Sequence, residues 1–466
     1  MKCFSILAVM VLIGVTALAQ VPDAAALQKT DAGKRVIAYF DAYNSGDDGT
    51  LGKFFADNVA ADSLKQRPVE PRLAFHRRVR SDFGSIKISK VISVTAGEIK
   101  VQGKAGNGAL IDYAFQLSVD GKIASMTIDP GAESAASPAV TQAAAAPATA
   151  ADLSASLEDL FGGLARSGEF SGVVLVAKDG KPLFNRAYGL ADIANKVPNR
   201  LDTKFNLGSI NKMFTRVAIG QMVKAGKLSF SDKLIKVLPD YPNRDVAEKI
   251  TIGQIVTMTS GLGDIFTDSY FAMDGHKVRS LKDYLPLFAD KPLEFEPGTS
   301  NRYSNAGYVV LGIVIEKLSG KSYYDYVREN VFAPAGMRDS DSYEIDKLPA
   351  NTATGYMKKG TPERVPNPPA LPGRGSSAGG GYSTADDLLR FVAALTANKL
   401  VVPNDDGTLP TEFKGFGFAG GSEGINGILM SNPKTGYTIV VLSNFDPPSA
   451  EAPGMMVRDW IKQLKQ

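Results

Sequence analysis

Between residues 86 and 128, apolar and polar positions alternate, which is the period of β-strands that bury one face. The clearest run is Ile111, Tyr113, Phe115, Leu117 and Val119. An Asp-Gly pair directly after it gives the turn signal of a hairpin. Upstream, apolar residues recur at helical spacing over 36–43, and a second short helix is expected around 51–55. Helices followed by an antiparallel sheet predict a small α+β domain over residues 20–130.

The second patterned region begins and ends with strand-like runs. Near its start, a helix over 153–165 is followed by a hairpin around the turn Asp179-Gly180. Near its end, strands are expected over 427–430 and 437–442, ahead of a helix around 457–464. The pattern predicts an α+β or α/β fold in which both ends of the region build one antiparallel sheet. Terminal helices flank that sheet, and the middle of the region forms a helical subdomain.

Residues 131–151 separate the two patterned regions and consist largely of Ala, Ser, Thr and Pro. Such a composition offers almost no large side chain to bury and is typical of a solvated linker. The chain of 466 residues also exceeds what one hydrophobic core usually organises. We therefore expect a small domain over 20–130 and a larger domain over 152–466.

The first 19 residues have the layout of a secretory signal peptide. Lys2 precedes an apolar stretch over 4–15, and Ala17-Leu18-Ala19 supplies the small residues of a cleavage site. The apolar stretch is shorter than the ~20 residues that a membrane-spanning helix needs. We expect export to the periplasm or secretion, with no stable membrane insertion after residues 1–19 are removed.

Composition narrows the chemistry that the exported chain can use. The single cysteine, Cys3, lies inside the predicted signal, so disulfides, thiol catalysis and cysteine-bound metals are excluded from the mature chain. No metal and no cofactor are expected. The formal net charge is +3, and no basic block interleaved with aromatic residues is present, which argues against a nucleic-acid partner.

A Ser-x-x-Lys motif opens the segment that is the best candidate for catalysis. Ser209 and Lys212 precede apolar residues at helical spacing, so Ser209 is expected at a helix N-terminus with the lysine one turn on. A hydroxyl beside a base is an activated nucleophile. The motif alone is weak, because residues 431–434 match it too. That copy contains Pro433 at a turn and cannot present its lysine along a helix.

A second motif makes the assignment specific. The segment 297–308 reads Pro-Gly-Thr-Ser-Asn-Arg-Tyr-Ser-Asn-Ala-Gly-Tyr and leads into an apolar helix. Together with Ser-x-x-Lys it resembles the superfamily of class C β-lactamases, D-alanyl peptidases and related esterases, which includes penicillin-binding proteins. The resemblance runs from about residue 170 to the C-terminus and includes the segments 259–262 and 376–384. The domain over 20–130 loosely resembles nuclear-transport-factor-like cone domains.

The resemblance implies roles for three residues beside the nucleophile. Tyr303 would be the general base toward Ser209, Lys212 would hold this tyrosine near ionisation, and Asn305 would bind the substrate carbonyl or amide. An ordinary tyrosine pKa is near 10, and a lysine cation can lower it. The mature chain has only two histidines, His76 and His276, and the second lies in a polar stretch. A histidine-dependent triad is therefore the less favoured mechanism.

The third family motif is where this chain departs from the pattern. Relatives carry Lys-Thr-Gly or His-x-Gly on a strand whose end completes the oxyanion hole. The literal match, residues 434–436, falls between two strand-like runs and is expected to be a hairpin turn. Counting strands instead selects residues 417–424, where Phe418 takes the cation position. Gly420 and Gly421 would then line the oxyanion hole, with the amide of Gly421 as donor.

Phe418 removes a positive side chain that receives the substrate carboxylate in β-lactam-recognising relatives. Met258 stands where relatives often have histidine, and Arg374 is either a substitute cation or a solvated surface residue. The sequence thus predicts an exported serine hydrolase that forms an acyl-enzyme with a small-molecule or peptide substrate. Esters are favoured over β-lactams and D-amino-acid peptides. The alternative is a catalytically weakened binding or sensory protein of the cell envelope.

Overall fold

The computed structural model describes residues 24–464 apart from 67, 96, 106–109, 131–145, 148, 359–362 and 369–370. The predicted signal peptide and most of the predicted linker lie outside the described residues. The chain divides into two compact units, residues 1–132 and 133–466. Among the described residues, no helix has both the length and the apolar composition needed to span a membrane.

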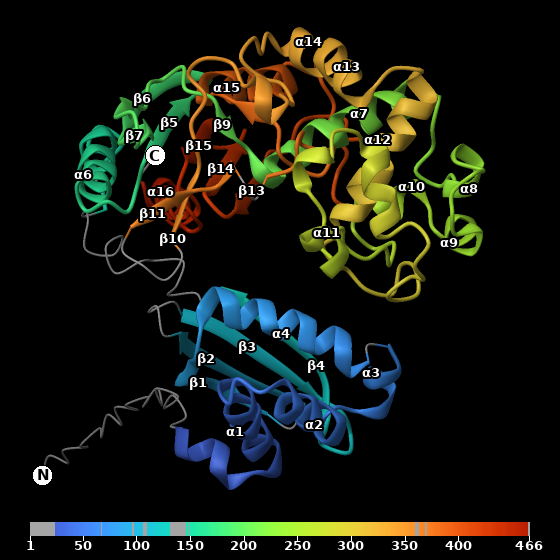
Figure 1. The fold of residues 1–466 in the computed structure, drawn as a ribbon. Coiled ribbons are helices and arrows are strands. Elements are labelled where there is room, and N and C mark those ends of the chain that lie inside the picture. The colour runs from blue at the N-terminus through green and yellow to red at the C-terminus, as the bar shows by residue number, and fades with distance from the viewer. Residues whose placement is uncertain are drawn as a thin grey trace, which may run out of the picture. The chain divides into compact units, whose positions relative to one another are not determined.

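The first unit has helices followed by a sheet, in the order that its sequence pattern predicts. After a 3-10 turn (Ala24–Lys29), the helices are α1 (Asp31–Asn44), α2 (Asp48–Asn58), α3 (Ala61–Gln66) and α4 (Val69–Phe83). An antiparallel sheet follows in the order β1 (Ile86–Val94), β2 (Glu98–Ala105), β3 (Leu110–Leu117) and β4 (Ile123–Pro130). Figure 1 shows the helices gathered against this sheet. The sequence pattern missed α4.

Aromatic side chains fill the core of the first unit. Tyr39 and Tyr43 of α1 pack with Tyr113 and Phe115 of β3, and all four are buried. The predicted alternation along β3 is confirmed up to Leu117, where the strand ends. Val119 was expected to continue the buried face, and this prediction is wrong, because Val119 lies beyond the strand and is exposed.

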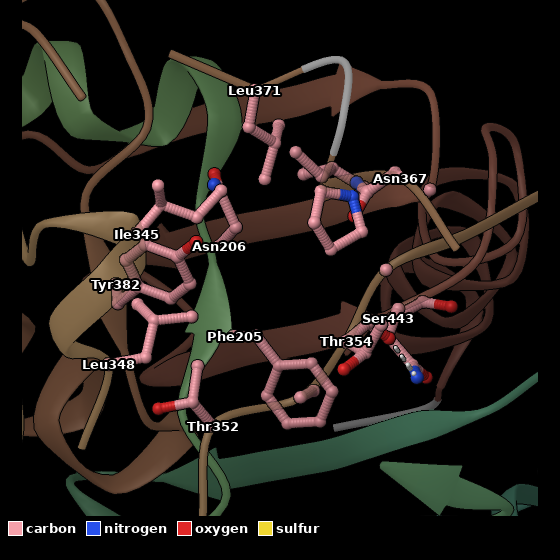
Figure 2. A pocket seen from close by; sticks show the side chains of 16 residues that line it. Phe205, Asn206, Ile345, Leu348, Thr352, Thr354, Asn367, Leu371, Tyr382 and Ser443 are labelled. Carbon is pink, nitrogen blue, oxygen red and sulfur yellow. Dashed lines mark hydrogen bonds between the residues drawn. The ribbon is translucent and has the colours of Figure 1, made fainter. Parts of the chain in front are cut away.

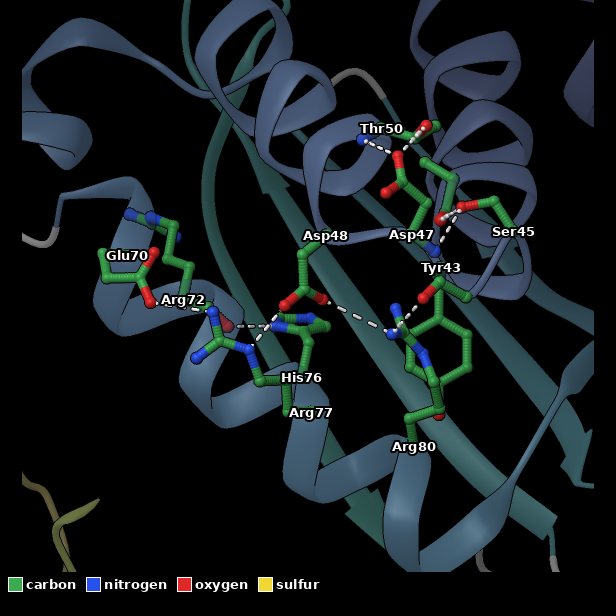
Figure 3. Close-up of polar contacts among 12 residues, drawn as sticks. Tyr43, Ser45, Asp47, Asp48, Thr50, Glu70, Arg72, His76, Arg77 and Arg80 are labelled. Atoms are coloured by element: carbon green, nitrogen blue, oxygen red, sulfur yellow. Dashed lines mark hydrogen bonds and ion pairs between the residues drawn. The ribbon is translucent and has the colours of Figure 1, made fainter.

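Ion pairs connect α4 to the N-terminal end of α2 (Figure 3). Arg77 donates to Asp48 at 2.5 Å and to Glu70 at 2.8 Å, and Arg80 donates to the carbonyl of Gly46 at 3.0 Å. Aspartate at the start of a helix is also stabilised by the helix dipole. These contacts add to the packing of the buried α4 residues Leu73 and Val79 in the core of the first unit.

The second unit is built on a five-stranded antiparallel sheet with the order β13-β14-β15-β5-β6. The strands are β5 (Gly172–Lys178), β6 (Lys181–Tyr188), β13 (Phe416–Ser422), β14 (Ile425–Asn432) and β15 (Tyr437–Ser443). The helices α6 (Leu153–Arg166) and α16 (Glu451–Gln463) cover one face. Both ends of the unit therefore build one sheet under terminal helices, as predicted (Figure 1).

Successive side chains of β5 pack into two different cores, one on each face of this sheet. Val174 and Val176 of β5 pack with α6 and α16, whereas Val173 and Leu175 face the opposite core with α7 (Lys212–Lys224). Successive side chains of a strand point to opposite faces, so a strand buried on both sides is apolar throughout. The predicted architecture of one antiparallel sheet under terminal helices, with a helical middle, is confirmed.

The remaining helices form a helical part that packs with α7. They are α8 (Leu234–Val237), α9 (Arg244–Lys249), α10 (Ile252–Val256), α11 (Asp268–Ala272), α12 (Asn305–Ser319), α13 (Tyr323–Val327), α14 (Ala333–Ala335) and α15 (Ala385–Thr396). Three strand pairs are short: β7 (Leu190–Asp192) with β8 (Val197–Pro198), β9 (Phe205–Asn206) with β12 (Tyr382–Ser383), and β10 (Tyr356–Lys358) with β11 (Arg364–Pro366). The fully buried α12 residues Tyr308 and Leu311 anchor this part.

The edge strand β13 approaches the 3-10 turn Gly208–Asn211 very closely. A Cβ placed on Gly420 would lie 2.1 Å from the carbonyl oxygen of Leu207 and 2.9 Å from the nitrogen of Ser209. Both neighbours are backbone atoms that cannot rotate away. Glycine at position 420 is therefore required for the strand and the turn to touch.

We expect Gly420→Ala to destabilise the protein by about 1–3 kcal/mol, the usual cost of overpacking. Gly417→Ala is the matched control on the same strand, since its Cβ would come no nearer than 3.4 Å to the flexible Met430 side chain. Denaturant unfolding of the two variants measures the difference. Equal stability of both variants would contradict the close approach of β13.

Candidate active site

Ser209 lies in the 3-10 turn Gly208–Asn211, which leads directly into α7. Gly208 has a φ of +49°, a left-handed conformation that glycine adopts without steric cost. The loop over 379–381 holds the turn: Gly380 donates its N–H to the Gly208 carbonyl at 3.3 Å, and Leu207 donates to the Gly381 carbonyl at 2.8 Å. Ser209 thus precedes the α-helix by one turn instead of beginning it.

Lys212 is fully buried, with 0% of its surface exposed. Its Nζ lies 3.1 Å from Ser209 Oγ and donates to Asn305 Oδ1 at 2.7 Å and to the Ala378 carbonyl at 2.5 Å. Burial lowers the pKa of Lys212 to about 7, and the negative charge of Asp264 opposes this shift in part. A substantial fraction of the Lys212 side chains is therefore neutral at neutral pH.

Tyr303 is the second hydrogen-bond partner of Ser209, with its hydroxyl 2.5 Å from Ser209 Oγ. The residue is 46% exposed, but desolvation by burial raises the pKa of Tyr303 to about 12, against a smaller lowering by the bond to Ser209. The prediction that Lys212 lowers this pKa is wrong. A lysine whose own pKa is near 7 is not a permanent cation, so it cannot hold the phenol near ionisation.

Asn305 begins α12, and its amide lies between Lys212 and Asp264. Its Oδ1 accepts from Lys212, while its Nδ2 donates to the Asp264 carboxylate oxygens at 3.1 and 3.0 Å. Its backbone N–H also donates to Asp264 at 3.3 Å. Sequence analysis missed Asp264, although it follows the segment 259–262 by only two positions. Binding of substrate by Asn305 stays a prediction.

The end of β13 lies beside Ser209, the predicted nucleophile. The nitrogen of Gly421 is 3.0 Å from the position that a Cβ on Gly208 would take, and Gly420 lies against the nitrogen of Ser209. Phe418 is two residues before Gly420, so it shares the strand face that Gly420 turns toward Ser209. The ring of Phe418 is partly buried against the core of the second unit.

The alternative cation positions are engaged elsewhere. Lys434 lies in the turn between β14 and β15. Both the Lys-Thr-Gly match and the second Ser-x-x-Lys match include this lysine, so the predicted hairpin turn is confirmed for both. Since Gly421 pairs with Asn426, this turn lies roughly 20 Å further along β14, at 3.3 Å per residue. The Arg374 guanidinium stacks 3.6 Å over the Tyr324 ring.

Both histidines contact groups other than Ser209. His276 is exposed, and its ring is 3.3 Å from the Pro368 carbonyl, whereas His76 belongs to the core of the first unit. Within the described part of the chain, the hydrogen-bond partners of Ser209 Oγ are Lys212 and Tyr303. Among the described residues, no group of three or more His, Cys, Asp or Glu side chains could hold a metal ion.

A cavity of about 50 Å³, open to solvent, lies next to the turn Gly208–Asn211. Its walls include Phe205, Asn206, Asn367 and Tyr382, and no residue of the Ser209 site lines it (Figure 2). Asn206 lines the cavity and also binds the turn that carries Ser209, because its Oδ1 accepts the N–H of Gly208 at 3.0 Å. The 16 lining residues carry no ionisable acid or base apart from the Tyr382 phenol.

Known proteins similar to this chain include penicillin-binding proteins and an esterase. Penicillin-binding protein 4* of Bacillus subtilis is 35% identical over 189 residues, which are 40% of this chain and 41% of that protein. The chain thus spans less than half the length of this relative. Esterase EstB of Burkholderia gladioli is 32% identical over 289 residues, covering 54% of this chain and 73% of that protein.

A solved penicillin-binding protein from Bacillus halodurans has 31% identity and a TM-score of 0.57, covering 64% of this chain and 98% of that one. The hydrolase EstCE1, at 22% identity and a TM-score of 0.56, shares the fold. The profile of the Beta-lactamase family matches residues 152–460, about two thirds of the chain. The chain therefore belongs to the beta-lactamase family of serine hydrolases.

Proposed function

We propose that this chain is an exported hydrolase that cleaves a neutral ester through an acyl-enzyme on Ser209. The observation that carries this proposal is the pair of short contacts to Ser209 Oγ, one from the buried amine of Lys212 and one from the hydroxyl of Tyr303. An oxygen with a proton acceptor on one side and a proton donor on the other is an activated nucleophile.

Lys212 serves as the general base in this proposal. Asn305 Oδ1 and the Ala378 carbonyl can only accept hydrogen bonds, so they take the two N–H groups of a neutral lysine. The lone pair of Nζ is then directed at the Ser209 hydroxyl. A pKa of about 7 matches the working pH, which is where general-base catalysis is most efficient.

Tyr303 serves as a proton donor and relay. With a pKa of about 12, its phenol stays protonated at neutral pH and can donate to the developing alkoxide of Ser209. Its hydroxyl can then pass a proton to the departing alcohol, and the Lys212 ammonium, which holds the proton taken from Ser209, returns that proton to the phenolate. The backbone amides of Ser209 and Gly421 would receive the negative charge of the tetrahedral intermediate.

Phe418 supports the preference for a neutral substrate. Its ring shares the strand face that approaches Ser209, so an anionic substrate group there would lose water without gaining a cation. The relatives include an esterase, penicillin-binding proteins and a D-amino acid amidase. Among these substrate classes, esters make the least demand for a positive side chain at position 418.

Export and the role of the first unit belong to the same proposal. Residues 1–19 would direct export to the periplasm or the medium, and residues 131–151 would link the two domains. The four helices and the four-stranded antiparallel sheet of the first unit support a nuclear-transport-factor-like domain over 20–130. The proposed partners are a small-molecule or peptide substrate, without nucleic acid.

A fluorophosphonate should label Ser209, and Ser209→Ala should abolish labelling in intact-protein mass spectrometry. Lys212→Ala and Tyr303→Phe should each slow labelling by about 10² or more, the usual contribution of general acid–base catalysis. Circular dichroism checks that the variants fold. Labelling of another serine would overturn the assignment of Ser209, and near-normal rates in both variants would return the mechanism to a histidine. No labelling of the folded wild-type protein would favour the binding-protein alternative.

The rate of Ser209 acylation should rise with pH around a midpoint near 7. The active form needs Lys212 neutral, and the pKa of about 7 means that acid protonates it and removes the base. Tyr303 must stay protonated, and its pKa of about 12 predicts no loss from this group below about pH 10. Stopped-flow labelling from pH 5 to 10 measures the profile. A profile that is flat through pH 7, or that falls as pH rises, would be incompatible with Lys212 as base.

Turnover of short-chain neutral esters should exceed that of cephalosporins or D-alanyl peptides by orders of magnitude. Phe418→His should narrow this gap, because it returns a polar, cation-forming side chain to the strand face. Phe416→His is the matched control, since Phe416 lies on the same face of β13 one repeat further from Gly420. An unchanged ester-to-cephalosporin ratio in Phe418→His would show that another group sets the preference.

A further inference from the structure

Asp264 is an acidic group bonded to Asn305, and no part of the proposed reaction uses it. It lies in the loop between α10 and α11, directly after Gly263, whose carbonyl accepts the hydroxyl of Ser304 at 2.6 Å. Its carboxylate also accepts the N–H of Phe266 at 3.1 Å. This loop is therefore bonded to the segment that carries Tyr303 and Asn305 at both a backbone and a side-chain position.

The carboxylate determines which way the Asn305 amide faces. Both Asp264 oxygens lie within 3.1 Å of Asn305 Nδ2, and a carboxylate can only accept. The amide nitrogen must therefore face Asp264, which leaves Oδ1 toward Lys212 at 2.7 Å. If the amide turned over, Nδ2 would face the lysine and compete with it as a donor. The lone pair of Lys212 would then no longer be directed at Ser209.

We propose that Asp264 is a positioning residue that acts on Lys212 through Asn305. It fixes the amide so that the lysine base points at Ser209, and it supplies the negative charge that sets the pH at which the lysine releases its proton. This inference rests on the proposed function only for the role of Lys212 as base. The Asp264–Asn305–Lys212 chain itself stands on the hydrogen bonds described here.

Asp264 is the charged neighbour of Lys212 in the hydrogen-bond network formed by Lys212, Asn305 and Asp264. Tyr303 and Tyr308 present their rings at 4.7 and 5.5 Å from Nζ, and both have raised pKa values of about 12, so they are neutral at working pH. One turn along α7, Arg216 is bound to Asp405 at 2.8 Å. Asp264 is the charge that raises the pKa of Lys212 against the effect of burial, and it also raises that of Tyr303.

The test compares wild type with Asp264→Asn, which keeps the size of the side chain and removes its charge. We expect the midpoint of the acylation-rate profile to move to lower pH by about one unit, because loss of a nearby negative charge disfavours the lysine cation. The plateau rate should fall about tenfold, since an amide at position 264 no longer dictates the orientation of Asn305. Asp264→Glu, which restores the charge, should return the midpoint to within a few tenths of a unit.

Asp274→Asn is the matched control. Asp274 is an exposed carboxylate that follows α11, where it accepts the N–H of His276, and this substitution should move neither the midpoint nor the plateau. If Asp264→Asn does not fold, Asp264→Ser takes its place, because a serine hydroxyl can still accept the N–H of Phe266 and hold the loop. Thermal unfolding verifies the fold of each variant.

A second readout makes the outcome independent of turnover. The titration of Lys212 is followed by NMR of 13C-labelled lysine, with the signal assigned by its absence in Lys212→Met. A midpoint that moves to lower pH in Asp264→Asn supports the inference even if wild type fails to acylate, in which case the proposed function alone falls. An unmoved Lys212 titration overturns the inference, whether or not the rate decreases, because a purely structural role would change the rate alone.

Discussion

The site depends on the burial of one amine. Lys212 has no exposed surface, so its charged form loses hydration, and three oxygen partners only partly replace the lost water. These partners come from the nucleophile turn, from α12 and from the loop over 376–378. Three segments far apart in sequence must therefore converge on α7. The cost of burying an ammonium lowers the pKa of Lys212, and in the proposed mechanism this makes Lys212 a base at neutral pH.

A second constraint is that the backbone of β13 lies very close to the backbone of the turn Gly208–Asn211. Gly208 uses a left-handed conformation to present Ser209, and Gly420 lets the edge strand β13 lie against the same turn. Side chains at either position would separate the strand from the nucleophile. In the proposed mechanism, Gly208 and Gly420 allow the amides of Ser209 and Gly421 to lie close enough to bind an oxyanion, and Phe418 on the same strand face disfavours anionic substrates.

Much of this arrangement could be predicted from the sequence, since strand periodicity and turn residues act locally. The terminal strands, the turn at Lys434 and the placement of Gly420 followed from counting strands. Helix α4 was missed because its arginine-rich sequence hides a narrow apolar stripe that ion pairs to α2 support. Asp264 and the direction of the Tyr303 pKa were missed for another reason. Both depend on tertiary burial and on charges brought together by the fold, which spacing along the chain does not contain.

The central claim is that Lys212 is neutral enough at working pH to accept the proton of Ser209. The most direct measurement is the titration midpoint of the Lys212 side chain in the wild-type protein, followed by its 13C resonance. The structure predicts a midpoint near 7, far below the ordinary lysine value of 10.5. A midpoint near 10.5 would mean that Lys212 is a permanent cation, and the proton of Ser209 would then need another acceptor.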